Sequence, residues 1–457
     1  MNRLKVFKGK KFHFVGIGGV SMSALAQIVK CRGFYVQGSD ENVNAEVKKL
    51  ARKKIKVCIG HSKDNVLGVD VVVYSSAVSA DNLELIQARK LNLIIIKRAE
   101  LLGLIAEEYN TVISIAGSHG KTTTTAMISE MFIKAGLKPT VHIGGRLKSI
   151  NSNVNIGNKK YFITENCEYK DNFLFIRPDI SVILNIDSDH LDYFKNLDGV
   201  KKSFYRFANE TKEGGLNLIF DGDVNLKEIK SLENSIEFGF NTSSDFCARN
   251  ILEYKKGYYS FDVLLKGCEL GNIRLNIVGK HNIINALASV FVGFVCGIDF
   301  DVIKSSLENY SGVERRCDKV GSVCGADVYH DYAHHPAQIK KMIELAKNLV
   351  DDNSRVITVF EPHTFSRTKY LSEEFAKSLS AADEIILAPV YSAREVESDG
   401  LTSLDLLEGI KKYNCKVDYF KSYFEIIKYL KCVVKQGDLL LVLGAGNIEK
   451  LAKRLVE

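Results

Sequence analysis

The chain has no tryptophan and only five prolines in 457 residues, and these two scarcities place no restriction on its fold or function. Long apolar runs are missing as well, since no stretch approaches the about 18 residues that a membrane-spanning helix requires. The ten cysteines include no C-x-x-C pair, and the first residues do not resemble a signal peptide. We therefore expect reduced thiols, a cytoplasmic location and no association with a membrane.

A concentrated basic segment is also absent. The formal net charge is +7, but the lysines are scattered and are not interleaved with aromatic residues. This distribution argues against a nucleic-acid-binding surface and is compatible with small anionic ligands. With 46% hydrophobic and 26% charged residues, the composition is that of a globular protein, and the length predicts about three domains.

The most informative motif is a glycine turn between a strand-like and a helix-like segment. Gly117-Ser118-His119-Gly120-Lys121-Thr122 follows the apolar run 112–116 and precedes a helical pattern that starts at Thr123. Backbone N–H groups in such a turn point at phosphate oxygens, the lysine adds positive charge, and the threonine can hold Mg²⁺. The standard pattern has glycine where this chain has Ile115, so the loop is shorter. We interpret it as a site for a nucleoside triphosphate; the alternative is an ordinary turn with a solvated lysine.

The first hundred residues predict a parallel α/β sheet with strands at 12–15, 35–38, 69–74 and 93–96. The turn after the first strand, Gly16-Ile17-Gly18-Gly19-Val20-Ser21, is close to the dinucleotide-binding pattern but has Ser21 at the third glycine position. Asp40 ends the second strand, where an acidic residue commonly meets a ribose. We interpret this segment as a site for a pyrophosphate such as that of a nucleotide sugar, with an NAD-dependent oxidoreductase as the alternative.

The rest of the chain predicts two further α/β domains. The strand pattern resumes at 161–163 and 180–184, changes to an antiparallel excursion over 216–277, and is followed by a helix over 282–295. A third α/β unit has strands near 328, 356–360, 384–388 and 439–443. We expect a Rossmann-like domain over 1–107, a central P-loop-type ATPase domain over 108–312, and a C-terminal Rossmann-like domain over 313–457.

Polar residues cluster after the predicted strands of the second domain. Glu165 ends one strand, and His190 follows another within the run 185–192, which carries three carboxylates. Such carboxylates repel one another unless cations or hydrogen-bond donors compensate their charge. Because Mg²⁺ prefers oxygen ligands and often takes only one or two from the protein, we expect these residues near a metal-bound triphosphate.

The third domain repeats this placement. Residues 329–336, which include three histidines, follow one strand, and residues 361–367 follow the next. The spacings of zinc sites are not recognisable in these segments. We therefore expect Arg367 and the histidines to bind carboxylate or phosphate.

Over essentially its full length the chain resembles the Mur ligases of bacterial cell-wall synthesis. The motifs that carry the resemblance occur in family order: Gly16 to Gly19, Gly117 to Thr125, Asn185 to Asp192, Gly279 to Ala286, Glu314 to Arg316, Asp331 to Pro336, and Pro362 to Arg367. The resemblance implies an ATP- and Mg²⁺-dependent ligase that joins L-alanine to the carboxylate of UDP-N-acetylmuramate through an acyl phosphate, releasing ADP and phosphate. It also implies a C-terminal domain that closes over the site; we expect a monomer or a homodimer.

The resemblance further implies roles for individual residues. Catalytic roles fall to Lys121, His190, His334 and Arg367. The ATP contacts are Gly117, Ser118, His119, Gly120, Lys121, Thr122, Thr123, Asn282, Asn285, Arg316 and Asp331. The magnesium contacts are Thr122, Glu165 and His190. The sugar-nucleotide contacts are Gly16, Gly18, Gly19, Asp40, His61, Ser75, Ser76 and Ala77.

Three positions depart from the family pattern. The family usually reads Glu-Ala-Asp-Glu at residues 165–168, and this chain has Cys167 at the aspartate position. We therefore keep Glu165 as the expected ligand and leave Glu168 out. Ser118 replaces a common threonine, and Thr364 stands where many relatives carry arginine. Two alternatives stay open: a recycling ligase that joins a whole peptide to the muramoyl group, and a nucleotide-sensing homologue without catalysis. Selectivity among alanine, glycine and serine stays open too.

Overall fold

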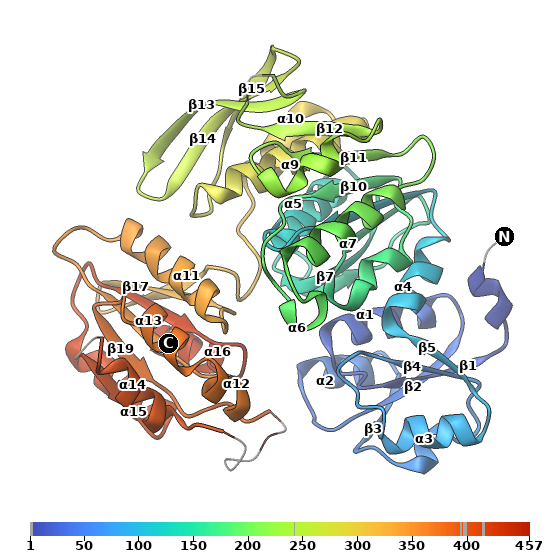
Figure 1. Ribbon diagram of the computed structural model, residues 1–457, viewed down its shortest axis with the longest axis horizontal. Helices are drawn as coiled ribbons and strands as arrows, with labels where there is room; N and C mark the ends of the chain where they lie inside the picture. Colours follow the sequence, from blue (N-terminus) through green and yellow to red (C-terminus); the bar gives the residue numbers. More distant parts are fainter. Residues whose placement is uncertain (1–2, 242, 394, 396–399, 414–415) are drawn as a thin grey trace. The chain divides into compact units, whose positions relative to one another are not determined.

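A computed structural model describes residues 3–241, 243–393, 395, 400–413 and 416–457, and it contains three β-sheets flanked by helices (Figure 1). The predicted α/β fold with three parallel-sheet domains is confirmed. The first sheet and most of the second belong to one compact unit, Met1–Leu252, Ser260–Ile277 and His281–Ser311. The third sheet belongs to a second unit, Glu253–Tyr259, Val278–Lys280 and Gly312–Glu457. None of the described helices combines the length and hydropathy that a bilayer crossing requires.

The first sheet has five parallel strands in the order β3-β2-β1-β4-β5. Phe12 and Phe14 of the first strand are buried on one face of the sheet, and Val15 is buried on the other, as expected for a sheet covered on both sides. The chain moves outward from β1 to β3 and then crosses to β4, so the turns after β1 and β4 open at the topological switch point, where such sheets bind ligands. The strands are β1 (Lys11–Val15), β2 (Tyr35–Asp40), β3 (Lys56–Ile59), β4 (Val71–Tyr74) and β5 (Ile94–Lys97), and the helices are α1 (Val20–Cys31), α2 (Ala45–Arg52), α3 (Leu83–Lys90) and α4 (Arg98–Ala106).

The second sheet has ten strands in the order β15-β14-β13-β12-β11-β10-β6-β9-β7-β8. The strands are β6 (Thr111–Ala116), β7 (Thr140–Leu147), β8 (Ser152–Asn155), β9 (Tyr161–Glu165), β10 (Ile180–Ile183), β11 (Leu216–Phe220), β12 (Ser235–Gly239), β13 (Phe246–Lys255), β14 (Tyr258–Leu265) and β15 (Cys268–Arg274). The helices are α5 (Lys121–Lys134), α6 (Leu191–Phe194), α7 (Leu197–Asn209), α8 (Lys227–Lys230), α9 (His281–Val295) and α10 (Phe300–Glu308), with a 3₁₀ helix, η3, at Tyr169–Phe175.

The predicted bounds of the antiparallel excursion were wrong. Strands β11 and β12 pair in parallel with the sheet, and β12 pairs in parallel with β13. Within this excursion β14 and β15 form an antiparallel pair at one end of the sheet. A second antiparallel pair, β7 with β8, lies at the other end of the sheet and outside the predicted excursion. Alternating polarity in β12 and β13 reflects half-exposed strands, and alternation alone does not distinguish parallel from antiparallel pairing.

The third sheet has six strands in the order β16-β17-β21-β18-β19-β20, parallel except for the β16–β17 pair. Separate apolar cores cover its two faces, one with Phe360 and Leu441 and the other with Val359 and Val442. The strands are β16 (Asp318–Val323), β17 (Ala326–Asp331), β18 (Val356–Phe360), β19 (Glu384–Leu387), β20 (Val417–Tyr419) and β21 (Leu439–Leu443), and the helices are α11 (Pro336–Leu349), α12 (Phe365–Tyr370), α13 (Ser372–Leu379), α14 (Ser403–Ile410), α15 (Tyr423–Val433) and α16 (Glu449–Val456).

Helix α4 packs so closely on η3 that its glycine admits no side chain. A Cβ atom at Gly103 would lie 2.1 Å from the carbonyl oxygen of Phe175, whereas one at Gly409 of α14 would lie 3.9 Å from the nearest side chain, Ala376. We expect Gly103→Ala to lower the free energy of unfolding by roughly 2 kcal/mol. The matched change Gly409→Ala should raise this free energy by up to about 1 kcal/mol, because alanine favours a helix. Urea unfolding followed by circular dichroism checks both; equal midpoints for the two variants would contradict the packing argument.

Candidate active site

The turn between β6 and α5 is held by the loop that follows β10. The Ser118 N–H donates to the Asn185 carbonyl over 3.0 Å, and the His119 N–H donates to the Asn185 side-chain oxygen over 2.8 Å. Gly117 has a φ of +140° and lies against Leu184, so a side chain at this position would be strained. These contacts fix the backbone of the turn in one conformation.

The start of α5 has the features of an anion-binding site. Gly120 is the N-cap residue with a φ of +84°, and no described side chain caps the helix. The N–H groups of Lys121, Thr122 and Thr123 lie in the first turn, where a helix offers them no backbone acceptor. The positive end of the helix dipole adds to their attraction for an anion.

Lys121 lies beside this helix start, with 14% of its side chain exposed. Its ammonium donates to both carboxylate oxygens of Glu168, over 2.9 and 3.1 Å, and to the Gly117 and Ser118 carbonyls. Burial alone lowers the pKa of this ammonium, but nearby negative groups, Glu168 foremost, raise its pKa above the ordinary value. A full positive charge is therefore held at the turn, and the carboxylate that holds it, Glu168, is one that the sequence interpretation had left out.

Thr122 and Glu165, both expected near a metal, contact each other. The Thr122 hydroxyl donates to Glu165 over 2.9 Å, and the Gly144 N–H donates to the second Glu165 oxygen over 2.7 Å. Glu165 ends β9, which pairs with β6, so adjacent parallel strands bring the carboxylate beside the turn. The pair presents oxygen ligands of the kind that Mg²⁺ accepts.

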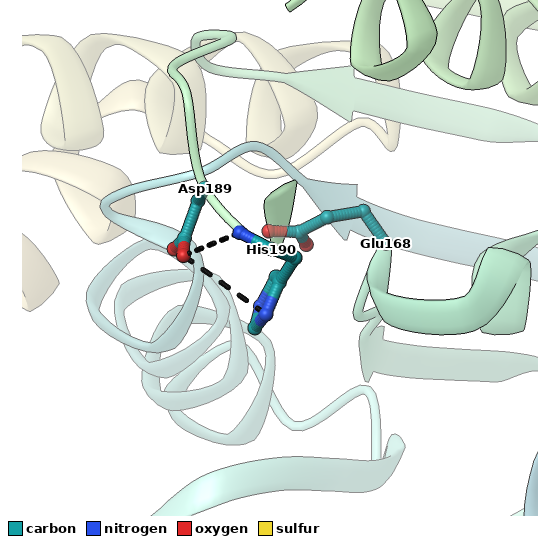
Figure 2. Close-up of side chains that lie close together, drawn as sticks. All are labelled: Glu168, Asp189 and His190. Carbon is teal, nitrogen blue, oxygen red and sulfur yellow. Dashed lines mark hydrogen bonds and ion pairs between the residues drawn. The ribbon is translucent and has the colours of Figure 1, made fainter. Parts of the chain in front are cut away.

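His190, the third expected metal ligand, lies with Glu168 and Asp189 (Figure 2). One ligand atom from each of the three side chains lies within 4.8 Å of the other two. An Asp189 oxygen accepts a 2.8 Å hydrogen bond from the His190 N–H and lies 3.9 Å from His190 Nδ1. Two carboxylates and an imidazole fit a divalent cation that accepts oxygen and nitrogen, such as Mg²⁺ or Mn²⁺. Asp189 was missed, although the acidic run 185–192 was a signal for it; the side chain of Asp192 lies outside the described set.

Asn282 and Asn285, expected near the adenine, lie buried on α9 against α5. Asn285 donates to the Asn282 side-chain oxygen over 2.9 Å and accepts from the Thr124 hydroxyl over 3.2 Å. A Cβ atom at Gly120 would lie 2.6 Å from the Asn285 oxygen. Asn285 therefore packs against the start of α5, and Asn282 holds the Asn285 amide in place.

The first glycine turn is closed by Asp40. Its carboxylate accepts the Gly18 N–H over 2.8 Å, and the Asn44 amide donates to the Gly18 carbonyl over 3.1 Å. A side chain at Gly18 would lie within 2.8 Å of Asp40 and 2.7 Å of Asn44. Gly16 has a φ of +74°, and Gly19 is the exposed N-cap of α1. Asp40 thus shapes the turn that was expected to bind the diphosphate.

His61 belongs to a buried polar network centred on Glu84. His61 Nδ1 lies 3.1 Å from the Ser39 hydroxyl and 3.3 Å from Glu84. Glu84 also accepts from Ser39 over 2.6 Å and from Asn65 over 2.6 Å, and it lies 3.2 Å from His13. Burial raises the pKa of Glu84, but the hydrogen bonds from His13, Ser39 and Asn65 outweigh it and lower the pKa to about 2.

The remaining expected sugar-nucleotide contacts, Ser75, Ser76 and Ala77, form the turn after β4. The Ala77 N–H donates to the Ser75 hydroxyl over 3.4 Å. This turn stands at the same switch point of the first sheet as the glycine turn after β1.

In the second unit, Asp331 is buried at the end of β17. It accepts the Cys317 and Ala333 N–H groups over 2.8 and 2.7 Å. Burial raises the pKa of Asp331, although Arg316 and these two donors oppose the shift. The Arg316 guanidinium lies 5.6 Å from the centre of the Tyr332 ring.

His334 lies in one cluster with His363 and Arg367. The rings of His334 and His363 are 6.0 Å apart, and His334 Nδ1 lies 3.0 Å from the Tyr332 carbonyl. Burial first, then Arg367 and His363, lower the pKa of His334 to about 4. His334 is therefore neutral at pH 7, with Nδ1–H donating to the carbonyl and Nε2 left as an acceptor.

Three family models match the chain. The Mur ligase family, catalytic domain, matches residues 11–110; the Mur ligase middle domain matches 115–293; and the Mur ligase, glutamate ligase domain, matches 315–446.

Individual relatives match over nearly the whole chain. A UDP-N-acetylmuramate–L-alanine ligase of Caldanaerobacter subterraneus is 44% identical and is covered over 98% of each chain. The protein of the same name from Clostridium acetobutylicum is 42% identical, with 97% of each chain covered. The crystal structure of UDP-N-acetylmuramate-alanine ligase MurC from Thermotoga maritima has a TM-score of 0.82 at 27% identity, with 98% of each chain covered. A murein peptide ligase from Psychrobacter arcticus, at 21% identity, TM-score 0.73 and 98% coverage of each chain, is similar in fold.

The group of Glu168, Asp189 and His190 predicts divalent-cation binding. We expect Asp189→Asn to weaken Mn²⁺ binding at least about tenfold in the presence of ADP, because a charged oxygen ligand is lost. Titration of free Mn²⁺ by electron paramagnetic resonance measures this without turnover. Asp198→Asn, at an exposed position of the first turn of α7, is the control and should bind as wild type. Equal Mn²⁺ affinity in all three proteins would exclude this group as a metal site.

The Glu84 network predicts a pH-dependent stability. The folded pKa of Glu84 is about 2, against 4.5 as the ordinary value, so its contribution is full above about pH 4.5 and is lost as the pH falls toward 2. We expect Glu84→Gln to cost roughly 2 kcal/mol at pH 7, with a difference from wild type that shrinks below pH 4.5. Urea unfolding at pH 7, 4 and 3 checks this. The exposed Glu373→Gln should change stability little at any of these pH values, and a constant Glu84→Gln difference would contradict the assignment.

Proposed function

The chain belongs to the Mur ligase family, and on this premise we propose that it joins L-alanine to UDP-N-acetylmuramate with cleavage of ATP to ADP and phosphate. The observation that carries the proposal is identity of 40–44% to alanine ligases across at least 96% of each chain. The reaction belongs to the synthesis of peptidoglycan precursors. The alternative peptide ligase is supported by solved structures at 21% and 25% identity, well below the identity to the alanine ligases.

The reaction has two steps. A carboxylate oxygen of the muramoyl group attacks the γ-phosphorus of ATP, and the bond from this phosphorus to the bridging oxygen breaks, which gives an acyl phosphate and ADP. The amine of alanine then attacks the acyl carbon, phosphate leaves, and the nitrogen loses a proton. Both steps bring negative charge together, so the chain must supply positive charge where it develops.

The turn after β6 is suited to the ATP phosphates. Its first-turn N–H groups and the Lys121 ammonium supply fixed and mobile positive charge, and the Asn185 contacts keep the turn in place. We assign magnesium to Thr122 with Glu165 and to the group of His190. A divalent cation there would supply further positive charge to the phosphate oxygens. Asn282 and Asn285 are proposed to lie beside the adenine.

The first sheet is proposed to bind the sugar nucleotide. Gly16, Gly18 and Gly19 form a turn whose backbone a ligand can approach closely. Asp40 holds this turn in shape by accepting the Gly18 N–H group. His61 and the turn Ser75 to Ala77 stand at the same sheet edge. Side chains and backbone there can hydrogen-bond a diphosphate and a ribose.

The third sheet is proposed to supply Arg316 and Asp331 to the nucleotide and His334 and Arg367 to the amino acid. His334 is neutral at pH 7, so its Nε2 can accept a hydrogen bond from the amine of alanine. Arg367 can pair with the carboxylate of alanine or with the transferring phosphate.

Domain limits, assembly and location complete the proposal. We place the domain boundaries near residues 107 and 312. The protein is proposed to act on small molecules as a monomer or a homodimer, and to do so in the cytoplasm, because a ligase that consumes ATP needs the compartment where ATP is supplied.

Substrate choice tests the proposal. We expect ADP release with UDP-N-acetylmuramate and L-alanine, and less than about one hundredth of that rate with a tripeptide in place of alanine. A coupled assay of ADP formation measures both rates, and the same assay with glycine and L-serine defines selectivity. ADP release with the tripeptide alone would reverse the choice of substrate.

Two substitutions in α5, one at Lys121 and one at an exposed control position, test the role of the turn in the same assay. Lys121→Met should lower kcat at least about 100-fold, because a charge aimed at the phosphates is lost. Lys134→Met, in the exposed last turn of α5, should retain full activity. Unchanged turnover in Lys121→Met would overturn the role of the turn.

A further inference from the structure

The positive charge of Arg98 has no carboxylate partner among the residues that the structure describes. Arg98 is the first residue of α4 and is only partly exposed. Burial lowers the pKa of its guanidinium, and the Cys167 thiol opposes this shift. A partly buried guanidinium normally has an anionic partner, because desolvating an unpaired charge is costly.

The position of Arg98 is fixed by a directed chain of hydrogen bonds. Arg98 donates to the Ser21 hydroxyl over 3.1 Å, and this hydroxyl lies 2.8 Å from His142 Nε2. His142 Nδ1 lies 3.0 Å from the Thr164 hydroxyl. Burial first, then Arg98, lower the pKa of His142 to about 3, so the ring is neutral. The Thr164 hydroxyl donates to the Glu165 carbonyl over 3.1 Å, so it accepts from the Nδ1–H group of His142. The Nε2 atom of the neutral ring then accepts from the Ser21 hydroxyl.

This chain of contacts joins the two expected phosphate sites. Ser21 is two residues beyond Gly19 in the first glycine turn and occupies the third glycine position of that motif. Thr164 immediately precedes Glu165, which binds Thr122 at the start of α5. Arg98 therefore lies at the end of this chain that belongs to the turn assigned to the sugar nucleotide, and His142 and Thr164 link it to the sheet edge assigned to ATP.

Cys167 is the neutral neighbour of two cations. A cysteine thiol is ordinarily uncharged near pH 7, and the charges of both Lys121 and Arg98 interact with Cys167. Lys121 has Glu168 as its partner, whereas Arg98 has no comparable carboxylate among the described residues. The guanidinium of Arg98 is therefore available to pair with an anionic group of a ligand.

We propose that Arg98, held by Ser21, binds an anionic group of the sugar-nucleotide substrate and determines its affinity and specificity. The inference rests on the proposed function and adds to it a residue outside the expected glycine, aspartate, histidine and serine contacts. Two anionic groups of that substrate could meet Arg98: the diphosphate, and the muramoyl carboxylate that must reach the γ-phosphate. A guanidinium binds either through paired N–H donors.

The affinities for two sugar nucleotides show which of these two anionic groups binds Arg98. UDP-N-acetylglucosamine has the diphosphate but lacks the carboxylate of UDP-N-acetylmuramate. We expect Arg98→Gln to raise the Kd for UDP-N-acetylmuramate roughly 10- to 100-fold, as for a lost charged hydrogen bond. An equal loss with both ligands assigns the diphosphate, and a loss confined to UDP-N-acetylmuramate assigns the carboxylate. Calorimetric titration measures these values without turnover, and an unchanged Kd for ADP shows that the ATP site is intact.

A second pair of variants tests the charge while leaving Arg98 in place. Cys167→Asp gives the guanidinium an internal partner and should raise the Kd for UDP-N-acetylmuramate at least about fivefold, because the ligand then competes with a carboxylate. The matched change Cys167→Ser keeps the site neutral and should stay within about twofold of wild type. This pair also keeps the proposal testable if Arg98→Gln fails to fold.

Two results would overturn the proposal. One is wild-type affinity for both sugar nucleotides in Arg98→Gln. The other is a loss in Arg98→Gln without any loss in Cys167→Asp, which would give Arg98 a purely structural role. Failure of the proposed function is distinct, since it would show as absent binding of UDP-N-acetylmuramate, or absent ligation of alanine, in the wild-type protein.

Discussion

A largely buried ammonium needs a compensating negative charge, and Lys121 takes it from Glu168. The same carboxylate lies in the group with Asp189 and His190 (Figure 2). One carboxylate thus serves both an ammonium and a candidate cation site. A triphosphate that accepts the ammonium would release Glu168 toward a cation, so the two ligands would favour each other's binding. The coupling follows from charge balance within the site and requires no change in the fold.

The fold brings these groups together because parallel strands deliver their carboxyl ends to one edge. In the second sheet, β6, β9 and β10 are neighbours, and the residues that follow them are the glycine turn, Glu165 and the acidic loop. The first sheet repeats the arrangement with the turns after β1 and β4, and the third with the segments after β17 and β18. The central strands of each sheet are buried on both faces, so polar side chains gather where these strands end.

Central strands could be predicted from the sequence, whereas of the edge strands only those with an apolar run, such as β5, could be. Apolar runs predict strands that are buried on both faces, and such runs occur in β1, β6, β10, β18 and β21. Strands β3, β8, β16 and β20 lie at or next to the sheet edges, are short or half-exposed, and lack such runs, so they were missed. β7 was missed as well, because its central glycines interrupt the apolar pattern. At the site, motif spacing identified Lys121, whereas its partner Glu168 depends on a contact across 47 residues that spacing does not reveal.

Ser21 and Cys167 both depart from common motifs, and both affect the environment of Arg98. Ser21, at a position usually occupied by glycine, provides the hydroxyl that orients the guanidinium, and Cys167 provides a neutral surface where a carboxylate would have neutralised it. The neutral His142 completes the arrangement, because a protonated ring would have no lone pair to accept from Ser21. Lys121 and Arg98 therefore differ in electrostatic state: Glu168 compensates the charge of Lys121, whereas Arg98 has no such carboxylate among the described residues. The proposed site brings two polyanions together and so needs positive charge of both kinds, one that orders the turn after β6 and one that the bound substrate would compensate.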